Sequence, residues 1–118
     1  MEHSECKFNY TECIHNLYPL RDSIEVLGPK WRIQILVVIR YGNESFTAIQ
    51  NALETISPRI LSKELKILEE NGLIVREISP TYPIKISYKW TPHTESIVSI
   101  IDTLKDWGQV HRTHLFKK

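Results

Sequence analysis

Hydrophobic residues recur at helical spacing along most of this chain, and the pattern is clearest over residues 57–72. Ser57 can accept a hydrogen bond from the first free backbone N–H groups of a helix. Pro58 suits the first helical position because it has no N–H to leave unpaired, and Gly72 suits the left-handed residue that ends a helix. Local chemistry therefore predicts both ends of this helix.

The predicted helix has two chemically different faces, because successive residues are rotated by about 100°. Leu61, Leu65 and Leu68 fall on one side and are expected in the core. The opposite side is polar and cationic, and it consists of Arg59, Ser62, Lys63 and Lys66. Taken alone, such a face is most often a solvated surface, so the neighbouring segments decide whether it binds an anion.

Shorter elements are expected before this helix. Residues 1–17 lack periodicity and are expected to form an irregular N-terminal arm. Pro19 is expected to begin a short helix that ends before Gly28, and a second helix is expected over residues 30–40. The second helix carries enough apolar residues to require burial.

A third helix is expected to open at Phe46 and to end near Leu53. Thr47 and Gln50 have the spacing of a capping box, in which each side chain satisfies the other residue's backbone N–H. Residues 54–56 then lead directly into the helix over 57–72. Two helices joined by a short turn, the second with a cationic face, indicate a helix-turn-helix.

The period changes from helical to alternating after Gly72. Residues 73–78 and 84–90 are predicted strands, joined by a turn over 79–83, and residues 73–90 together form a wing hairpin. The side expected to face the core comprises Ile84, Ile86, Tyr88 and Trp90. The outward side, expected beside the cationic helix, comprises Lys85, Ser87 and Lys89. An ordinary hairpin with solubilising lysines explains the alternation equally well, but not its position after a cationic helix.

A last helix is predicted over residues 92–116, with Thr91 as its cap, Pro92 at its first position and Gly108 as an interruption. Its apolar stripe comprises Ile97, Ile100, Ile101, Leu104 and Trp107. Since the core is already closed by the preceding elements, a subunit interface is at least as good an explanation for this stripe as packing within the chain.

Composition favours one compact domain, assigned to residues 18–118, because 42% of the 118 residues are hydrophobic and 25% are charged. No apolar run approaches the roughly 20 residues that span a bilayer, and the polar start lacks the apolar region of a signal peptide. Two cysteines cannot form a disulfide framework. These features predict a cytoplasmic protein without membrane contact.

The formal net charge of +1 does not by itself indicate a nucleic-acid partner. Its distribution is more informative, because residues 57–90 carry six basic and four acidic groups whereas residues 1–27 carry two basic and five acidic groups. The cationic side of the molecule is therefore expected in the middle of the chain, where it permits phosphate binding.

Candidate catalytic or metal-binding residues are few. His3, Cys6, Cys13 and His15 are ligand types but lack the short paired spacing of zinc sites. His111 and His114 lie three residues apart without a third ligand, and there is no glycine-rich phosphate loop or nucleophile motif. We expect no catalytic activity, no metal and no cofactor.

Several motifs between Tyr18 and Trp107 together carry a family resemblance. They are Tyr18-Pro19-Leu20-Arg21-Asp22, Gly28-Pro29-Lys30-Trp31, Phe46, Ile56-Ser57-Pro58-Arg59-Ile60-Leu61-Ser62, Leu65, Leu68-Glu69-Glu70-Asn71-Gly72-Leu73-Ile74, and Tyr82-Pro83 before Tyr88. In this combination the chain resembles the HxlR-type family of bacterial winged-helix (MarR-like) transcriptional regulators.

The resemblance implies a fold that is mainly α with a small β-hairpin, a winged helix-turn-helix with additional N- and C-terminal dimerisation helices. It also implies a homodimer that places its recognition helices in successive major grooves and its wings on the flanking backbone or minor groove. The dimerisation residues are then Leu20, Ile24, Ile97, Ile101, Leu104 and Trp107.

Two residues depart from the family pattern. Tyr18 occupies the position of the family's cysteine, and Thr94 occupies that of the glycine that often follows the threonine after the second strand. The first departure removes the usual redox-sensing thiol. Cys6 and Cys13 are the remaining redox candidates, but they lie in an acidic arm, which disfavours the thiolate. We therefore do not expect a thiol switch of the family's usual kind.

The leading functional hypothesis is a sequence-specific DNA-binding transcriptional regulator that binds double-stranded operator DNA as a homodimer. The expected DNA-binding residues are Ser57, Arg59, Ser62, Lys63, Lys66, Arg76, Lys85 and Lys89. Arg59 and Ser62 are expected to reach base edges, and the lysines to contact phosphate. The alternative is a winged-helix protein-interaction module without specific DNA binding. The sequence identifies neither the operator nor a small-molecule effector.

Overall fold

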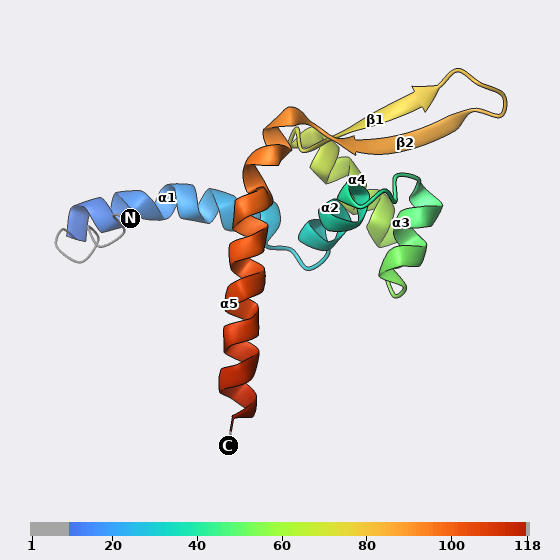
Figure 1. Cartoon of the computed structure of the whole chain (residues 1–118). Coiled ribbons are helices and arrows are strands. Elements are labelled where there is room, and N and C mark those ends of the chain that lie inside the picture. Colours follow the sequence, from blue (N-terminus) through green and yellow to red (C-terminus); the bar gives the residue numbers. More distant parts are fainter. Residues whose placement is uncertain (1–9, 118) are drawn as a thin grey trace.

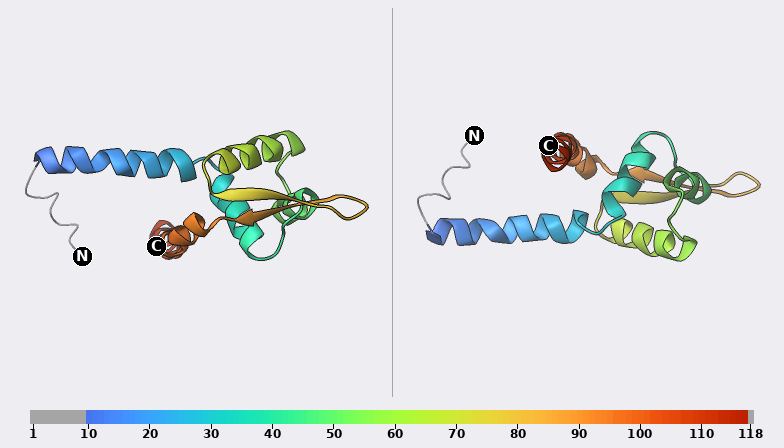
Figure 2. Two further views of the ribbon diagram at one scale, coloured as in Figure 1. Left: turned by 90° about the horizontal axis from the view of Figure 1, so that it is seen from above. Right: turned by 90° about the horizontal axis from the view of Figure 1, so that it is seen from below.

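The computed structural model describes residues 10–117, which form helices around one small hairpin (Figure 1). The elements are α1 (Tyr10–Leu27), α2 (Arg32–Arg40), α3 (Phe46–Leu53), α4 (Pro58–Glu70), β1 (Ile74–Ser79), β2 (Lys85–Trp90), the 3-10 helix η2 (Pro92–Ile97) and α5 (Val98–Phe116). Helices α2, α3 and α4 lie together beside the hairpin, whereas α1 and α5 project from this body in different directions (Figures 1 and 2). The predicted fold class, mainly helical with one antiparallel hairpin, is confirmed.

The core lies where α2, α3, α4 and the base of the hairpin meet. Its buried side chains are Ile35, Leu36, Ile39, Ile49, Ile56, Leu61, Leu65, Leu68, Leu73, Ile74 and Ile97. The three leucines predicted on one face of α4 are all among them. Trp90 packs against this cluster, and its indole Nε1 donates a 2.9 Å hydrogen bond to the Leu36 carbonyl, which ties β2 to α2.

Helix α1 is longer than the sequence predicted. It begins at Tyr10, so residues 10–17 are helical and the expectation of an irregular segment there was wrong. Pro19 lies inside the helix and does not start it. A proline removes one helical hydrogen bond. Because α1 is exposed around this position, water can hydrate the carbonyl of His15 that loses its partner.

The helix-turn-helix is confirmed, although its first helix is capped differently from the prediction. Ser45 is the N-cap of α3, and its Oγ accepts a 3.0 Å hydrogen bond from the Ala48 backbone N–H, so the proposed box of Thr47 and Gln50 was wrong. After α3, Glu54 has φ 61° and ψ −56°, and the Thr55 N–H donates to the Leu53 carbonyl at 2.6 Å. This geometry is a γ-turn of the rare, strained kind.

Helix α4 has the predicted ends. The Oγ of Ser57 accepts a 3.1 Å hydrogen bond from the Ile60 backbone N–H, and Pro58 is the first helical residue. Gly72 follows the helix with φ 74°, a conformation that glycine adopts without a Cβ clash.

Strands β1 and β2 are antiparallel, with Ile74 opposite Trp90 and Ser79 opposite Lys85. Tyr88 and Trp90 pack against the core as predicted, but Ile84 and Ile86 are exposed, so their expected burial was wrong. The predicted alternation of side chains along this strand is correct, but the hairpin extends beyond the helices that could cover its far end (Figure 1).

The C-terminal helix begins with a 3-10 segment. Thr91 precedes η2 without capping it, since its hydroxyl donates to the Gly72 carbonyl at 2.6 Å, which corrects the predicted cap. Thr94 is fully buried, and its hydroxyl donates to the Leu73 carbonyl. Helix α5 then continues through Gly108, so the predicted interruption there was wrong. The two threonines thus join the start of the last helix to the start of β1.

Candidate nucleic-acid interface

The polar face of α4 is exposed over its whole length. Arg59, Ser62, Lys63 and Lys66 all point away from the core, as their helical spacing requires. Ser57, at the N-terminus of the same helix, is also exposed, but its hydroxyl oxygen already caps the Ile60 N–H. The cationic face of α4 is therefore free to meet a ligand.

A groove of about 340 Å³ joins α4 to the hairpin. Ser62, Lys66 and Glu69 line it from α4, and Arg76 and Tyr88 line it from the two strands. Arg76 and Tyr88 are opposite each other in the strand pairing. The groove thus places two cations from different elements, Lys66 and Arg76, and the Glu69 carboxylate around one channel. Lysine and arginine are the usual protein contacts to phosphate.

The two lysines of β2 do not join this groove. Side chains alternate along a strand, so Lys85 and Lys89 lie on the hairpin face opposite to Arg76 and Tyr88. Lys89 is moreover paired with Glu44 before α3, with its Nζ 3.2 Å from the Glu44 carboxylate. The expectation that Lys85 and Lys89 lie beside the cationic helix was therefore wrong, and Arg76 is the hairpin cation that lines the groove next to α4.

An ion pair that the sequence did not predict fixes α4 against the first two helices. The Nε of Arg32 lies 2.6 Å from the Glu64 carboxylate, and the side chains are only 12% and 9% exposed. The guanidinium also donates to the Glu25 and Val26 carbonyls near the end of α1. One arginine therefore links three helices, and Glu64 is not available to weaken the cationic face of α4.

A second cluster joins α2 to the start of the C-terminal helix. Both carboxylate oxygens of Glu95 accept hydrogen bonds from Arg40, each at 2.7 Å, and the guanidinium lies over the Trp90 ring at 4.7 Å. The hydrogen bonds to Glu95 raise the pKa of the Arg40 guanidinium above its ordinary value. Arg40 thus joins α2 both to Glu95 in η2 and to Trp90 at the base of the hairpin.

Apolar side chains are exposed on α1 and α5. They are Tyr18, Leu20 and Ile24 on α1, and Ile100, Leu104, Trp107, Val110, Leu115 and Phe116 on α5. Of the predicted dimerisation residues, Ile97 is buried in the core and Ile101 packs against it, so these two anchor α5 to its own chain. Trp107 stacks on His111, with ring centroids 4.9 Å apart.

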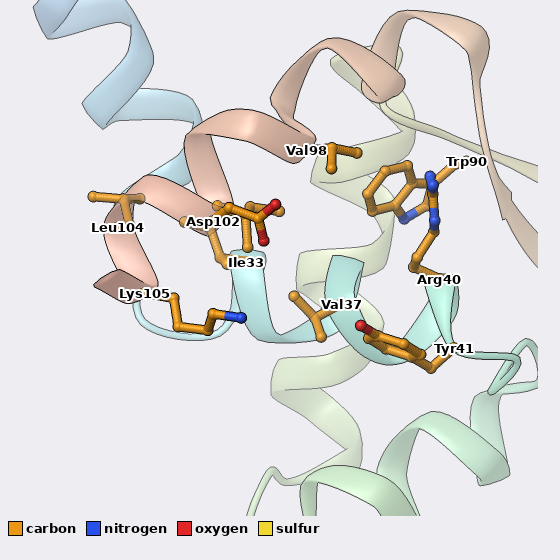
Figure 3. A pocket seen from close by; sticks show the side chains of 10 residues that line it. Ile33, Val37, Arg40, Tyr41, Trp90, Val98, Asp102, Leu104 and Lys105 are labelled. Carbon is orange, nitrogen blue, oxygen red and sulfur yellow. The ribbon is translucent and has the colours of Figure 1, made fainter. Parts of the chain in front are cut away.

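An open groove of about 720 Å³ lies between α2 and α5 (Figure 3). Its lining is mostly apolar and includes Val37 from α2, Tyr41 directly after α2, and Val98 and Leu104 from α5, with Trp90 at one end. The groove and the exposed apolar residues of the two terminal helices leave apolar surface open to a partner.

The side chains that the structure describes, those of residues 14–117, include no cluster of three or more suited to a metal ion. Of the candidate ligands, His3 and Cys6 lie outside the described residues, and the side chain of Cys13 lies outside the described side chains. The helices of the described part of the chain are too short or too polar to cross a membrane.

Comparison with known proteins decides the family. The model of the HxlR-like helix-turn-helix family matches residues 26–115. An uncharacterised HTH-type transcriptional regulator of Methanothermobacter thermautotrophicus is 32% identical over 92 residues, which cover 78% of this chain and 70% of the relative. This chain belongs to the HxlR-like helix-turn-helix family.

Other relatives agree in fold as well as in sequence. YtcD of Bacillus subtilis is 28% identical over 80% of this chain and 75% of its own. The crystal structure of YtcD superposes with a TM-score of 0.75, covering 80% of this chain and 96% of that one. The redox regulator HypR in its reduced form superposes with a TM-score of 0.77 at 26% identity, covering 85% and 99%. The predicted class, a DNA-binding transcriptional regulator with a winged helix-turn-helix, is thereby confirmed.

Proposed function

We propose that this HxlR-like protein binds specific operator DNA as a homodimer and acts in the cytoplasm. The observation that carries the proposal is the groove between α4 and the hairpin, where Lys66 and Arg76 converge beside the free cationic face of α4. In this proposal α4 enters the major groove, with Arg59 and Ser62 near its N-terminus at the base edges. Lys63, Lys66 and Arg76 then contact phosphate.

The hairpin contributes the second set of contacts in this proposal. Lys85 is exposed and has no ion-pair partner among the described residues, so we assign it a phosphate on the flank of the site. Lys89 is assigned a weaker role, because a phosphate must compete with the Glu44 carboxylate for its ammonium group.

Dimerisation is supported by the exposed terminal helices. Leu20 and Ile24 on α1, with Leu104 and Trp107 on α5, are exposed apolar side chains on helices that project from the body of the protein (Figure 2). A second copy that covers them removes this surface from water, and each Å² of apolar surface buried contributes about 25 cal/mol. A twofold axis then presents two copies of α4 to two half-sites.

The DNA part is tested by selecting duplexes from a library with a randomised central region, using the full chain. We expect enrichment of an inverted repeat, because a twofold dimer reads the same half-site twice. The matched variant carries both Arg59→Ala and Lys66→Ala. It should remain folded, because both side chains are exposed. Retention of all duplexes equally, or of none, contradicts the proposal and favours the protein-interaction alternative.

The dimer part is tested by light scattering on the full chain at several concentrations. We expect the mass of a dimer, and the mass of a monomer for Leu104→Ser with Trp107→Ser. Asp106→Ser, at a neighbouring exposed position of α5, is the control that should leave the mass unchanged. A monomeric mass for the unmodified chain at every concentration rules the dimer out.

A further inference from the structure

Helix α1 meets the body of the protein at a junction with little free space. Val26 and Leu27, at the end of the helix, pack against the core. The N–H of Gly28 donates to the Ile24 carbonyl at 2.7 Å, and a Cβ on Gly28 would lie only 2.4 Å from that oxygen. The end of α1 is therefore closely fitted, and its direction depends on the groups that hold it.

Arg32, the first residue of α2, supplies hydrogen bonds to the last turn of α1. The final carbonyls of a helix have no N–H partner within it, and Pro29, four residues after Glu25, has no N–H to donate. The Nη1 of Arg32 donates to the Glu25 carbonyl at 3.0 Å and to the Val26 carbonyl at 3.1 Å. Its positive charge also interacts favourably with the C-terminal end of the helix dipole. Arg32 therefore caps α1 from the start of α2.

The same guanidinium reaches the middle of α4. Its Nε donates to the Glu64 carboxylate at 2.6 Å. The side chains of Arg32 and Glu64 are only 12% and 9% exposed, so water competes little for this hydrogen bond. A guanidinium is planar, and its N–H groups point in fixed directions. A single rigid group therefore links the end of α1 to the middle of α4.

The other ion pairs described above do not make this connection. Arg40 joins α2 to Glu95 in η2, but these side chains are 43% and 56% exposed. Exposed ion pairs contribute little, because water and salt compete with them. Lys89 and Glu44 join β2 to the segment before α3. Of these pairs, only the one with Arg32 involves α4.

We propose that Arg32 is a positioning residue that sets the spacing between the two half-sites of the operator. The inference rests on the homodimeric DNA binding proposed above, in which Leu20 and Ile24 place α1 at the interface between the two copies. The angle between α1 and α4 then determines how far apart the two copies of α4 lie and how they are turned. Arg32 is nearly buried, and it touches no DNA in this proposal.

Half-site spacing responds sensitively to that angle. Two half-sites on one face of a duplex lie about 34–36 Å apart, which is one turn of about 10–10.5 base pairs. One added base pair moves a half-site by roughly 3.4 Å along the axis and by about a tenth of a turn around it. A dimer whose α1–α4 angle is fixed cannot follow both changes without strain, whereas a dimer with a looser junction can. Arg32 should therefore affect the spacing without affecting how one half-site is read.

The experiment uses the full chain and the half-site enriched by the selection described above. Duplexes carry two inverted half-sites whose separation is the selected one, or is shorter or longer by one or two base pairs. A further duplex carries a single half-site. Anisotropy measures the dissociation constant for each duplex. We expect the unmodified protein to bind the selected spacing about tenfold more tightly than its neighbours, an effect similar to that of one mismatched base pair.

Arg32→Lys changes the geometry of the link while keeping its charge. The ammonium group can still pair with Glu64, but it lacks the planar fork that reaches the α1 carbonyls at the same time. We expect the preference for one spacing to fall to about twofold, with the affinity for the single half-site unchanged. Gln34→Ala is the matched control on α2, because Gln34 is exposed and its Nε2 donates only to the nearby Lys30 carbonyl, at 2.9 Å. It should keep the full preference.

A second variant removes the link entirely. Arg32→Met with Glu64→Leu leaves no buried charge, and such apolar replacements of a buried ion pair are often neutral or stabilising. It should also lose the preference for one spacing. Circular dichroism and light scattering should show both variants folded and dimeric, because the exposed apolar residues of α1 and α5 are unchanged. If Arg32→Lys does not fold, the double variant decides the outcome.

The outcomes separate this proposal from the one on which it rests. If the unmodified protein is monomeric or enriches no duplex, homodimeric DNA binding fails, and the role of Arg32 fails with it. If it enriches an inverted repeat but binds every spacing equally, or if a folded and dimeric Arg32 variant keeps the same preference, only the role of Arg32 is overturned. It is also overturned if such a variant weakens binding to the single half-site as much as to the pair, because Arg32 then only supports the fold of α4.

Discussion

Arg32 and Glu64 form a 2.6 Å ion pair between α2 and α4, although 32 residues separate them in the chain. The pair is nearly buried, and the same guanidinium also holds two carbonyls near the end of α1. One arginine therefore helps to fix the position of the candidate recognition helix α4 relative to α1 and α2.

Removing one partner of this pair should destabilise the protein strongly. Glu64→Leu leaves the Arg32 charge without its carboxylate in a site with little water, and we expect a loss of about 3 kcal/mol in the free energy of unfolding. Urea denaturation at a fixed protein concentration measures it. The double variant Arg32→Met with Glu64→Leu should be more stable than Glu64→Leu alone, because no buried charge remains unpaired. Strictly additive losses contradict this coupling.

Glu54, in the turn of the helix-turn-helix, is a position where a substitution should stabilise. Its φ of 61° with ψ of −56° is a strained conformation for any residue with a Cβ. Glycine relieves that strain but adds flexibility to the unfolded chain, so Glu54→Gly should gain roughly 1 kcal/mol net. Thermal unfolding compares it with Glu54→Ala, which removes the carboxylate but keeps the Cβ. Equal stability of the two variants shows that the backbone is not strained.

Arg59 and Lys85 should differ in how they affect DNA binding. Arg59→Ala removes a side chain proposed to read a base, so it should weaken a specific site by about 1–3 kcal/mol and relax discrimination at one position. Lys85→Ala removes a proposed phosphate contact, so it should weaken all duplexes alike and lower the salt slope by about one unit. Anisotropy titrations over a range of salt concentrations measure both effects. Lys117→Ala, beyond the end of α5, is the control.

Mild oxidation should leave DNA binding unchanged. Tyr18 stands on α1 where the family resemblance expects cysteine, and a phenol cannot form a disulfide. Cys13 follows Glu12 in the sequence, and neighbouring negative charge disfavours the thiolate, whereas Cys6 lies outside the described residues. Binding is compared before and after diamide, in the unmodified chain and in Cys6→Ser with Cys13→Ser. Loss of binding in the unmodified chain alone, reversed by a thiol reductant, identifies the N-terminal segment as a sensor.

The sequence predicted the elements whose signals are local. Ser57, Pro58 and Gly72 define the ends of α4 by the chemistry of their own backbone groups, and the structure confirms all three. The Arg32–Glu64 pair could not be predicted in this way, because its partners meet only in the folded chain. One signal was present, since Glu64 follows Leu61 by three residues and precedes Leu68 by four, and this spacing places it on the apolar face of the helix.

The wrong predictions for the hairpin and for α1 have a common cause, because both depend on how far neighbouring elements extend and cover these segments. Alternation identified the face on which Ile84 and Ile86 lie, but it carries no information about where the helices beneath the hairpin end. The same limit applies to α1, where Pro19 looked like a start signal because a proline inside a helix is unfavourable. The cost is lower in a helix with solvent around it, and only the fold shows that α1 is such a helix.

The separation of α1 and α5 from the body has an evolutionary consequence. The side chains proposed to choose a partner lie on these two helices, whereas those proposed to choose DNA lie on α4 and the hairpin (Figure 1). The two sets share no residue. Of the predicted dimerisation residues, only Ile97 in η2 and Ile101 in α5 pack in or against the core. After gene duplication, each copy can change its pairing without changing its operator. Chimeras that exchange α1 and α5 between two relatives should accordingly inherit pairing from one parent and DNA preference from the other.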